Sequence, residues 1–281
     1  MSNLIISGKR KLFGCVNIEG SKNAILPIIA ASVLASSSVE LKNVPDFSDI
    51  KYMLEILKQM GAMVEWQQDR VVIDPTSICT TILPEVLTNK IRASIFLLGP
   101  LLAKFGSSTS AMPGGCQIGQ RPIDIHLAGF KDLGISVTEG SQVVCDASGF
   151  VGGTTVLRFA SVGATENIIM CAVLAHLKTT IIKNCAKEPE IVDLCNFINQ
   201  MGGKIYGAGT DTIVIVGVKK LYGANVEATD LRGGAAMTIS ALAAEGTSEI
   251  TCINHIDRGY EKIDSVLASL GADIKRKPET R

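Results

Sequence analysis

A phrase of helix-ending residues recurs four times, and this repetition limits the possible folds more than any other feature of the chain. Each copy has an apolar helical pattern, then a glycine, then a short apolar stretch, and the glycines are Gly61, Gly134, Gly202 and Gly271. The copies are spaced about 70 residues apart. A glycine in this place is typical of the C′ position of a helix, where the backbone turns left-handed. Regular spacing of this length indicates a repeat architecture.

The segments around each glycine repeat as well. We expect, in each copy, an apolar helix, a strand and an amphipathic helix. The apolar helices are expected at 24–34, 93–102, 165–174 and 233–242, the strands at 39–44, 109–112, 179–184 and 247–254, and the amphipathic helices at 48–60, 122–133, 190–201 and 259–270. A β-hairpin closes the first three copies, for example 204–206 with 212–216. Each unit is therefore predicted to be βαβαββ.

Such a unit cannot bury its own apolar surfaces, because it has one apolar sheet face and one apolar helix stripe. Copies must therefore pack together with their helices inward. We predict an α/β (α+β) protein whose first three units, residues 20–217, form one complete domain. The fourth unit, 218–281, together with 1–19, forms a partial second domain. This part is small for an independent fold, so we expect that a partner or further units complete it.

Composition excludes several functional classes. Lys plus Arg and Asp plus Glu each number 27, so the net charge is zero, and binding to nucleic acid or to an anionic membrane is not expected. The eight cysteines are scattered without a C-x-x-C pair, and the first residues lack the pattern of a signal peptide. We expect a reduced, cytoplasmic protein without a structural zinc site.

Polar clusters stand where each apolar helix begins. They are Ser21-Lys22-Asn23, Lys90-Ile91-Arg92, Ser161-Val162-Gly163 followed by Glu166-Asn167, and Asp230-Leu231-Arg232. The N-terminus of a helix carries free N–H groups and partial positive charge, so it favours anions, and a basic side chain there adds to the attraction. A single lysine at a helix start is usually a surface residue. Four equivalent starts, three of them basic, favour one shared anion site.

Two further loops carry chemistry-bearing residues. In the loop 112–126, Cys116 lies between glycines and close in sequence to Arg121 and His126. A nearby cation would lower the pKa of the thiol and make it reactive, whereas the alternative is a small buried cysteine. The stretch His255-Ile-Asp-Arg-Gly-Tyr260 lies between a strand and a helix, where either a helix cap or an active-site loop is expected.

These residues resemble a known family, the UDP-N-acetylglucosamine 1-carboxyvinyltransferases, which are enolpyruvyl transferases that open peptidoglycan synthesis. The matching stretches cover nearly the whole chain. They are 20–27, 91–94, 113–126, 161–167, 188–193, 228–232 and 255–261. The resemblance implies an inside-out α/β barrel of repeated units, with the active site between two domains. The shikimate-pathway enolpyruvyl transferase shares the repeat fold but lacks the cysteine-bearing loop, so it is the weaker match.

The resemblance implies catalytic roles for Cys116, Lys22 and Arg258. Cys116 would take part in proton transfer to phosphoenolpyruvate, form a covalent adduct and be the target of fosfomycin. Lys22 would contact phosphoenolpyruvate and the sugar nucleotide together with Asn23. The carboxylate of phosphoenolpyruvate would be held from the other domain by Arg258 with Asp230 and Arg232.

The resemblance also implies the nucleotide contacts. Arg92 and Arg121 would hold the diphosphate and the phosphate of phosphoenolpyruvate. The uridine side would be lined by Asp124, Ile125, His126, Ser161, Val162 and Gly163. A family lysine just before Ser161 is replaced by Phe159 or Ala160, which weakens this expected grip. No metal or organic cofactor is implied.

The family has six repeat units, and this chain has four. The resemblance places the jump near Gly217, so that the two absent units would include the aspartate that faces the sugar 3′-hydroxyl and one arginine of the carboxylate clamp. A positioned acid–base group contributes about 10²–10⁴-fold to rate. Three hypotheses therefore stay open. They are an enolpyruvyl transferase, a pseudoenzyme that binds UDP-N-acetylglucosamine, and a structural protein whose incomplete unit docks on a partner or a second copy.

Overall fold

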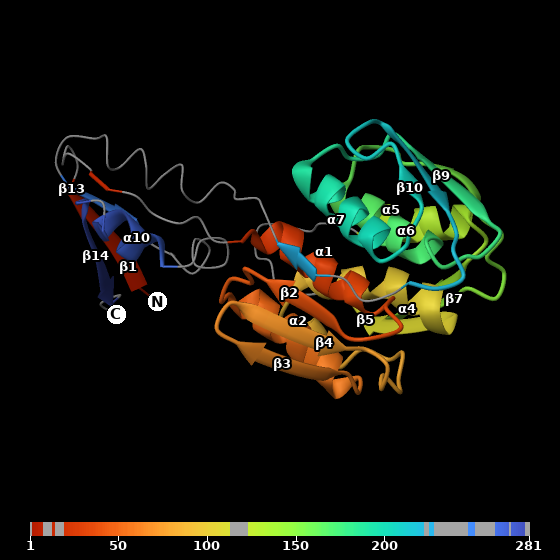
Figure 1. Cartoon of the computed structure of the whole chain (residues 1–281), viewed down its shortest axis with the longest axis horizontal. Helices are drawn as coiled ribbons and strands as arrows, with labels where there is room; N and C mark the ends of the chain where they lie inside the picture. The colour runs from red at the N-terminus through yellow and green to blue at the C-terminus, as the bar shows by residue number, and fades with distance from the viewer. Residues whose placement is uncertain are drawn as a thin grey trace.

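The computed structural model describes residues 2–7, 13–14, 20–112, 123–221, 225–227, 247–250, 262–269 and 271–278. Within these ranges the chain forms repeated layers of helices and sheets, as Figure 1 shows, and the predicted α/β class is confirmed. The four predicted C′ glycines Gly61, Gly134, Gly202 and Gly271 all have left-handed φ angles, of 107°, 87°, 97° and 95°. The repeating helix ends therefore fold as their sequence pattern indicates.

The first repeat follows the predicted order closely. Its elements are α1 (Lys22–Ser32), β2 (Val39–Lys42), α2 (Ser48–Gln59), β3 (Met63–Gln67) and β4 (Arg70–Asp74). Strands β3 and β4 form the closing hairpin, and β4 pairs antiparallel with β2. Alternate residues of β4 are buried, namely Val71 and Ile73, which indicates one sheet face on the core.

The second repeat departs from its prediction at the first helix. Its elements are α3 (Glu85–Thr88), η1 (Arg92–Leu97), α4 (Leu98–Phe105), β5 (Ser107–Ala111), α5 (Asp124–Asp132), β6 (Ser136–Glu139) and β7 (Gln142–Asp146). The single helix expected at 93–102 is a 3₁₀ helix, η1, that continues into the α-helix α4. Pro100 has no N–H to donate to Phe96, and proline is best tolerated in the first turn of a helix, so the α-helix begins just before it.

The third repeat is the most regular of the three. Its elements are β8 (Gly153–Val156), α6 (Val162–Ala172), β9 (Thr179–Lys183), α7 (Pro189–Gln200), β10 (Ile205–Tyr206) and β11 (Thr212–Val216). The sheet order is β10-β11-β9-β8, and β8 runs parallel to β9. Strand β8 precedes α6 in the chain and is thus the first strand of the predicted βαβαββ unit.

In the first repeat, the strand at the position equivalent to β8 comes from a distant part of the chain. The sheet order there is β12-β2-β4-β3, and β12 (Asn225–Glu227) runs parallel to β2. The second repeat has a shorter version in the described part of the chain, where a parallel bridge between Ile82 and Thr109 lies beside β5 in the sheet β5-β7-β6. The boundary predicted at residue 217 stays a prediction, and β12, which lies beyond it, belongs to the sheet of the first repeat.

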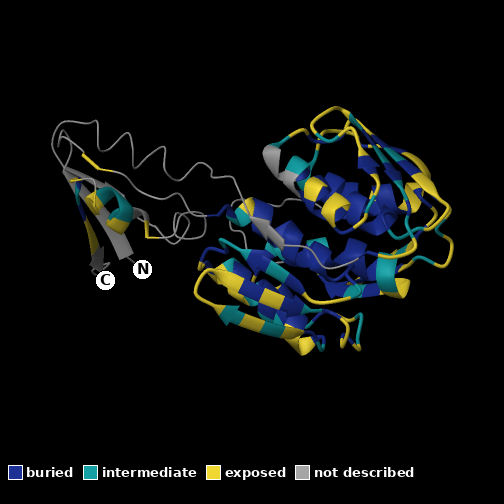
Figure 2. Cartoon of the chain, in the orientation of Figure 1, coloured by how far each residue is buried: buried dark blue, intermediate teal, exposed yellow. Residues whose placement is uncertain are grey.

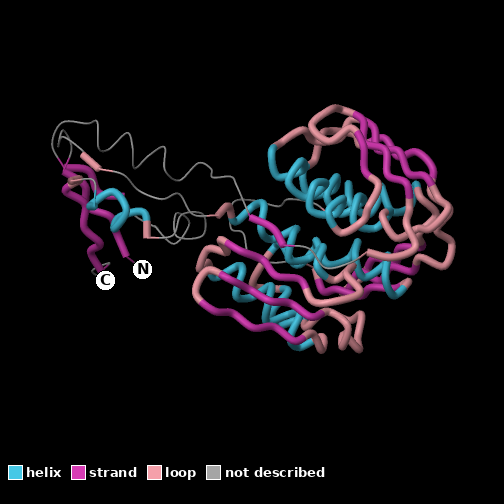
Figure 3. The backbone as a smooth tube through the Cα atoms, in the orientation of Figure 1, coloured by secondary structure: helices cyan, strands magenta, loops and turns pink. Residues whose placement is uncertain are grey.

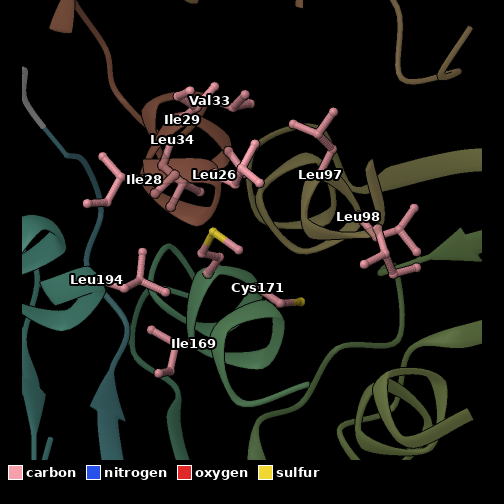
Figure 4. Packing of buried hydrophobic residues seen from close by; sticks show 14 of the residues in the cluster. Leu26, Ile28, Ile29, Val33, Leu34, Leu97, Leu98, Ile169, Cys171 and Leu194 are labelled. Carbon is pink, nitrogen blue, oxygen red and sulfur yellow. The ribbon is translucent and has the colours of Figure 1, made fainter. Parts of the chain in front are cut away.

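The helices lie between the sheets (Figure 3) and carry most of the core. Buried positions follow the helices and exposed ones the outer strands and turns, as Figure 2 shows. Helix α1 is buried from Ala24 to Ser32 and packs against α2, η1 and α7; Figure 4 shows part of this core, with Leu26 of α1 and Leu97 of η1 among the labelled residues. The expected inward packing of the helices is confirmed for these three repeats.

A fourth sheet joins the two ends of the chain. Strand β1 (Ser2–Ser7) lies between β13 (Thr247–Ile250) and β14 (Asp273–Pro278) and pairs antiparallel with both. Helix α10 (Ile263–Ser269) packs against β14. The apolar helix expected at 233–242 lies outside the described residues.

Candidate functional site

Three of the four predicted helix starts lie within the described residues. Helix α1 begins at Lys22, η1 begins at Arg92, and α6 begins at Val162 after the N-cap residue Ser161. The Ser161 Oγ accepts a hydrogen bond of 3.3 Å from the Ala164 N–H, which satisfies one of the free donors of that helix. Five predicted site residues lie outside the described residues. They are Cys116, Arg121, Asp230, Arg232 and Arg258.

Lys22 is held by a carboxylate at the start of the next helix. Its Nζ lies 3.2 Å from Asp49 Oδ2, and the two side chains are only 19% and 14% exposed. A lysine at the first position of a helix opposes the helix dipole, so the nearby anion offsets that cost. Asn23 follows in α1 and is exposed. Asp49 was not among the predicted site residues, although its place in the first turn of an amphipathic helix marks it in the sequence.

A second group of predicted residues meets where α5 and α6 begin. His126 is 5% exposed, and a methyl group placed on Gly163 would lie 3.2 Å from its Cε1 atom. Gly163 therefore allows the first turn of α6 to approach the imidazole ring closely. Burial and, to a smaller extent, the charge of Arg92 lower the pKa of His126 to about 4, against the opposing effect of Asp124. The structure thus brings Arg92, Asp124 and Gly163 together around the neutral imidazole of His126.

A small hollow of about 100 Å³ lies beside this group, between α5 and the end of β8. Asp124 and Ile125 line it from α5, and Arg158 lines it from the opposite side. Arg158 forms an ion pair with Asp124 Oδ2. Both side chains are largely exposed, so water screens this attraction. Arg158 was not predicted, but it supplies a cation one residue before Phe159, close to where the family lysine is replaced.

Asn167 is a further residue that the sequence prediction left without a role. It is fully buried in α6 and hydrogen-bonds Gly99, Ile95 and His126, each from another part of the second repeat. The sequence signal was the polar run Thr165-Glu166-Asn167 directly before an apolar stretch of the helix, since buried polar side chains are normally hydrogen-bonded. Val162, beside Ser161 at the start of this helix, is half-buried.

This arrangement is suited to an anionic ligand that also carries hydrogen-bonding groups. Helix starts and the cations Lys22 and Arg92 attract phosphate or carboxylate. Within the described ranges, no three His, Cys, Asp or Glu side chains gather in a way that could hold a metal ion. None of the helices in those ranges has the length and apolar character that a bilayer crossing demands.

The family model described as EPSP synthase (3-phosphoshikimate 1-carboxyvinyltransferase) matches residues 6–223 and 210–267. The chain belongs to this EPSP synthase family. The expected relationship to the enolpyruvyl transferases is thereby confirmed. The model matches in two segments that overlap only at 210–223, which is where the resemblance places a jump in the chain.

Relatives within the EPSP synthase family point to one branch of it. The chain is 45% identical over 277 residues to UDP-N-acetylglucosamine 1-carboxyvinyltransferase 2 of Carboxydothermus hydrogenoformans, covering 98% of this chain and 65% of that protein. It is 50% identical over 228 residues to UDP-N-acetylglucosamine 1-carboxyvinyltransferase 1 of Staphylococcus epidermidis, covering 79% and 54%. The chain therefore spans less than two thirds of the length of these relatives.

Solved structures support the fold of the family. The enolpyruvyl transferase NikO from Streptomyces tendae superposes with a TM-score of 0.81 at 16% identity, covering 99% of both chains. The EPSP synthase from Acinetobacter baumannii superposes with a TM-score of 0.65 at 18% identity, covering 81% of this chain and 52% of that one. At such low identity these likenesses show the shared fold alone.

Proposed function

We propose that the chain transfers the enolpyruvyl group from phosphoenolpyruvate to the 3′-hydroxyl of UDP-N-acetylglucosamine, releasing phosphate, as the first committed step of peptidoglycan synthesis. One observation carries this proposal. Arg92, Asp124, His126 and Gly163 meet at the starts of neighbouring helices, and the resemblance assigns these same residues to the sugar nucleotide. The names of the relatives at 45% and 50% identity support the choice of substrate.

The charges of the site fit the two substrates. Phosphoenolpyruvate carries a phosphate and a carboxylate, and the nucleotide carries a diphosphate, so several cations and helix starts are needed. In the proposal, Lys22 and Asn23 contact phosphoenolpyruvate, with Arg92 and Arg121 on the phosphates. Asp230, Arg232 and Arg258 hold the carboxylate.

The reaction needs proton transfers on two sides. C3 of phosphoenolpyruvate gains a proton while the sugar hydroxyl gives its proton to a base and its oxygen forms a bond to C2. The bond between C2 and the phosphate oxygen then breaks as C3 loses a proton again. In the proposal, Cys116 takes part in the proton transfer to C3. The nucleotide would lie along Asp124, Ile125 and His126 with Ser161, Val162 and Gly163.

A second candidate function is binding of UDP-N-acetylglucosamine without turnover. It is favoured by the alignment to the Carboxydothermus relative, in which 98% of this chain matches 65% of that protein. The two-segment match to the family model supports a jump near Gly217, and the units absent there would hold the general base. In this view the predicted domain 20–217 binds the nucleotide, and the part formed by 1–19 and 218–281 is incomplete and is a candidate for self-association.

The cellular setting is part of the same proposal. The substrates are small cytoplasmic molecules, and we propose a cytoplasmic protein. The free thiols at Cys79, Cys145, Cys171, Cys185 and Cys195 are compatible with a reducing compartment.

The deciding experiment measures phosphate release by the full chain with both substrates, alongside nucleotide binding by calorimetry. Cys116→Ala removes the proposed proton donor, and Cys79→Ala is the matched control, because Cys79 is an exposed free cysteine after β4. Release that needs both substrates and is lost only in Cys116→Ala supports the transferase. Nucleotide binding without release supports the second candidate, and absence of binding contradicts both.

A further inference from the structure

Asn167 occupies a break in the backbone hydrogen bonding of the second repeat. Its Oδ1 accepts from the Gly99 N–H at 2.7 Å, and its Nδ2 donates to the Ile95 carbonyl oxygen at 2.8 Å. Ile95 and Gly99 are four residues apart, so in a continuous α-helix the same N–H would donate to the same carbonyl. The amide of Asn167 therefore takes the place of one helical hydrogen bond, where η1 passes into α4.

This position fixes the orientation of the amide. A backbone carbonyl can only accept and a backbone N–H can only donate, so a reversed amide would face oxygen with oxygen at Ile95 and N–H with NH₂ at Gly99. A methyl group on Gly99 would lie 2.3 Å from the backbone oxygen and 2.5 Å from the Oδ1 of Asn167, so glycine is what lets the two helices approach this closely. The NH₂ group is therefore the end of Asn167 that reaches the imidazole.

The orientation of Asn167 decides where His126 carries its hydrogen. The Asn167 Nδ2 lies 3.1 Å from His126 Nδ1, and its second hydrogen points to that nitrogen while the first is used by Ile95. Since Nδ2 donates, Nδ1 must accept and be unprotonated, which leaves the single hydrogen of the neutral ring on Nε2. His126 is 5% exposed and its pKa is lowered to about 4, so the ring stays neutral around pH 7.

The protonated edge of the ring faces the start of α6. A methyl group on Gly163 would lie 3.2 Å from Cε1 and 3.4 Å from Nε2 of His126. Among the described residues, Nε2 has no hydrogen-bond partner, whereas Nδ1 is bonded to Asn167. The Nε2–H is thus a donor at the N-terminus of α6, near the charges of Arg92 and Asp124.

We infer that Asn167 is a positioning residue, which locks His126 as the Nε2–H tautomer and so presents a fixed donor to an acceptor oxygen of the bound nucleotide. The inference rests on the proposed function for the identity of the ligand, but the tautomer itself does not depend on it. Asn167 also sets the geometry of η1, whose first residue is Arg92, by bridging its end to α4. One buried amide thereby couples two predicted nucleotide-binding residues.

The tautomer is tested first, on the full chain without any ligand. The chain has three histidines, and nitrogen NMR of histidine-labelled protein distinguishes a protonated from an unprotonated ring nitrogen. The His126 signals are identified by their loss in His126→Gln. We expect Nδ1 unprotonated and Nε2 protonated at neutral pH. A protonated Nδ1, or an exchanging mixture of both forms, would overturn the inference whether or not the chain binds a nucleotide.

The coupling to ligand binding is tested with a double-mutant cycle, using UDP-N-acetylglucosamine as the titrant. Asn167→Leu should raise the Kd about tenfold in the wild-type background. In the His126→Gln background no tautomer remains to be fixed, so Asn167→Leu should raise the Kd less than about threefold. Equal losses in both backgrounds would mean that Asn167 is only structural, which contradicts the inference. If the wild-type chain binds no nucleotide, the proposed function fails, and the tautomer measurement still decides the inference.

A matched control is available in α7. Like Asn167, Asn199 bridges a backbone N–H and a backbone carbonyl, in this case both of Ile205: its Nδ2 donates to the Ile205 carbonyl and its Oδ1 accepts from the Ile205 N–H. Asn199→Leu removes an amide bridge at an exposed position of α7. We expect it to leave the His126 signals and the nucleotide affinity unchanged. If Asn199→Leu shifts the His126 signals as Asn167→Leu does, the effect is general loosening and the inference is wrong.

Discussion

Two seams that join the repeats are built from different interactions. The seam between the third and first repeats is closed by the segment 217–221 and by β12, through backbone hydrogen bonds and a buried apolar side chain at Leu221. The seam between the second and third repeats is closed around Asn167 and His126, which are buried polar groups. Apolar burial and backbone pairing carry no charge, whereas a buried imidazole can be protonated. Stability at the first seam should therefore be independent of pH, whereas the second seam adds a pH dependence next to the candidate site.

The largest expected effect tests the apolar seam. Leu221 is fully buried and forms a parallel bridge with Ala35 of the first repeat. Leu221→Ala should lower the free energy of unfolding by about 2–5 kcal/mol, because a cavity remains where the side chain packed. Urea unfolding at about pH 7.5 and again near pH 5 measures the loss, which should be the same at both values.

Leu177→Ala is the matched control for that experiment. Leu177 is 85% exposed, so its truncation should change the free energy of unfolding by less than about 0.5 kcal/mol. A loss below about 1 kcal/mol for Leu221→Ala would mean that segment 217–221 does not hold the first and third repeats together.

The polar seam should respond to acid. His126 has a pKa of about 4 in the folded chain, against an ordinary value of 6.5. The unfolded chain therefore binds a proton between these values while the folded chain does not, so stability is present above about pH 6.5 and falls as the pH drops toward 4. The full loss is about 3 kcal/mol, of which about 2 kcal/mol is lost by pH ~5. His126→Gln should unfold in urea without this part of the pH dependence.

The control is to measure the free energy of unfolding of wild type and of His126→Gln at each pH. Their free energies of unfolding should approach one another as the pH falls. A constant difference from about pH 7.5 to pH ~5 would show that His126 titrates alike in the folded and unfolded chains, and that its burial has no electrostatic consequence.

The sequence predicts local features of this fold better than the seams. Helix α2 starts at Ser48, as expected from its amphipathic pattern, and the C′ glycines adopt the predicted left-handed backbone. Such features depend on residues a few positions apart. In contrast, Asn167 pairs with residues 68 and 72 positions away, and Ser36 meets Leu221 across 185 positions. No periodicity encodes those partners, so their contacts follow from the packing of the repeats.

The candidate site likewise combines residues that are visible in the sequence with contacts that are not. The helix starts at Lys22, Arg92 and Ser161 are visible as polar clusters before apolar runs, and the structure places each at the start of a helix. Their partners Asp49 and Asn167 also stand out locally as polar residues of helices, but no local pattern predicts which residues they contact. Sequence patterns thus locate the functional groups, while their orientation depends on tertiary contacts.

A third seam, between the first and second repeats, has a partly charged character. Lys104 in α4 donates from Nζ to the Val33 and Ala35 carbonyl oxygens, at 2.7 and 2.8 Å, and so caps the end of α1. Lys104→Met keeps the aliphatic stem but loses both bonds, and should cost about 1–3 kcal/mol in urea unfolding. Lys51→Met is the control, because its ion pair with Asp46 is more than half exposed and should contribute less than about 1 kcal/mol. Equal losses for the two variants would mean that the carbonyls of α1 are satisfied by water once Lys104 is removed.

The smallest expected effect concerns the apolar seam again, and it separates a side-chain hydrogen bond from the backbone pairing and the buried leucine. The Leu221 carbonyl accepts both the Ser36 backbone N–H at 3.0 Å and the Ser36 Oγ–H at 2.7 Å. Ser36→Ala removes only the second bond, and the carbonyl keeps its backbone partner, so the free energy of unfolding should fall by about 0.5–1 kcal/mol. Ser38→Ala, which loses an exposed bond to Asp74, should cost less than about 0.5 kcal/mol. A loss above about 2 kcal/mol for Ser36→Ala would show that the hydroxyl, and not the buried leucine with its backbone pairing, holds this seam, and the distinction between an apolar and a polar seam would no longer stand.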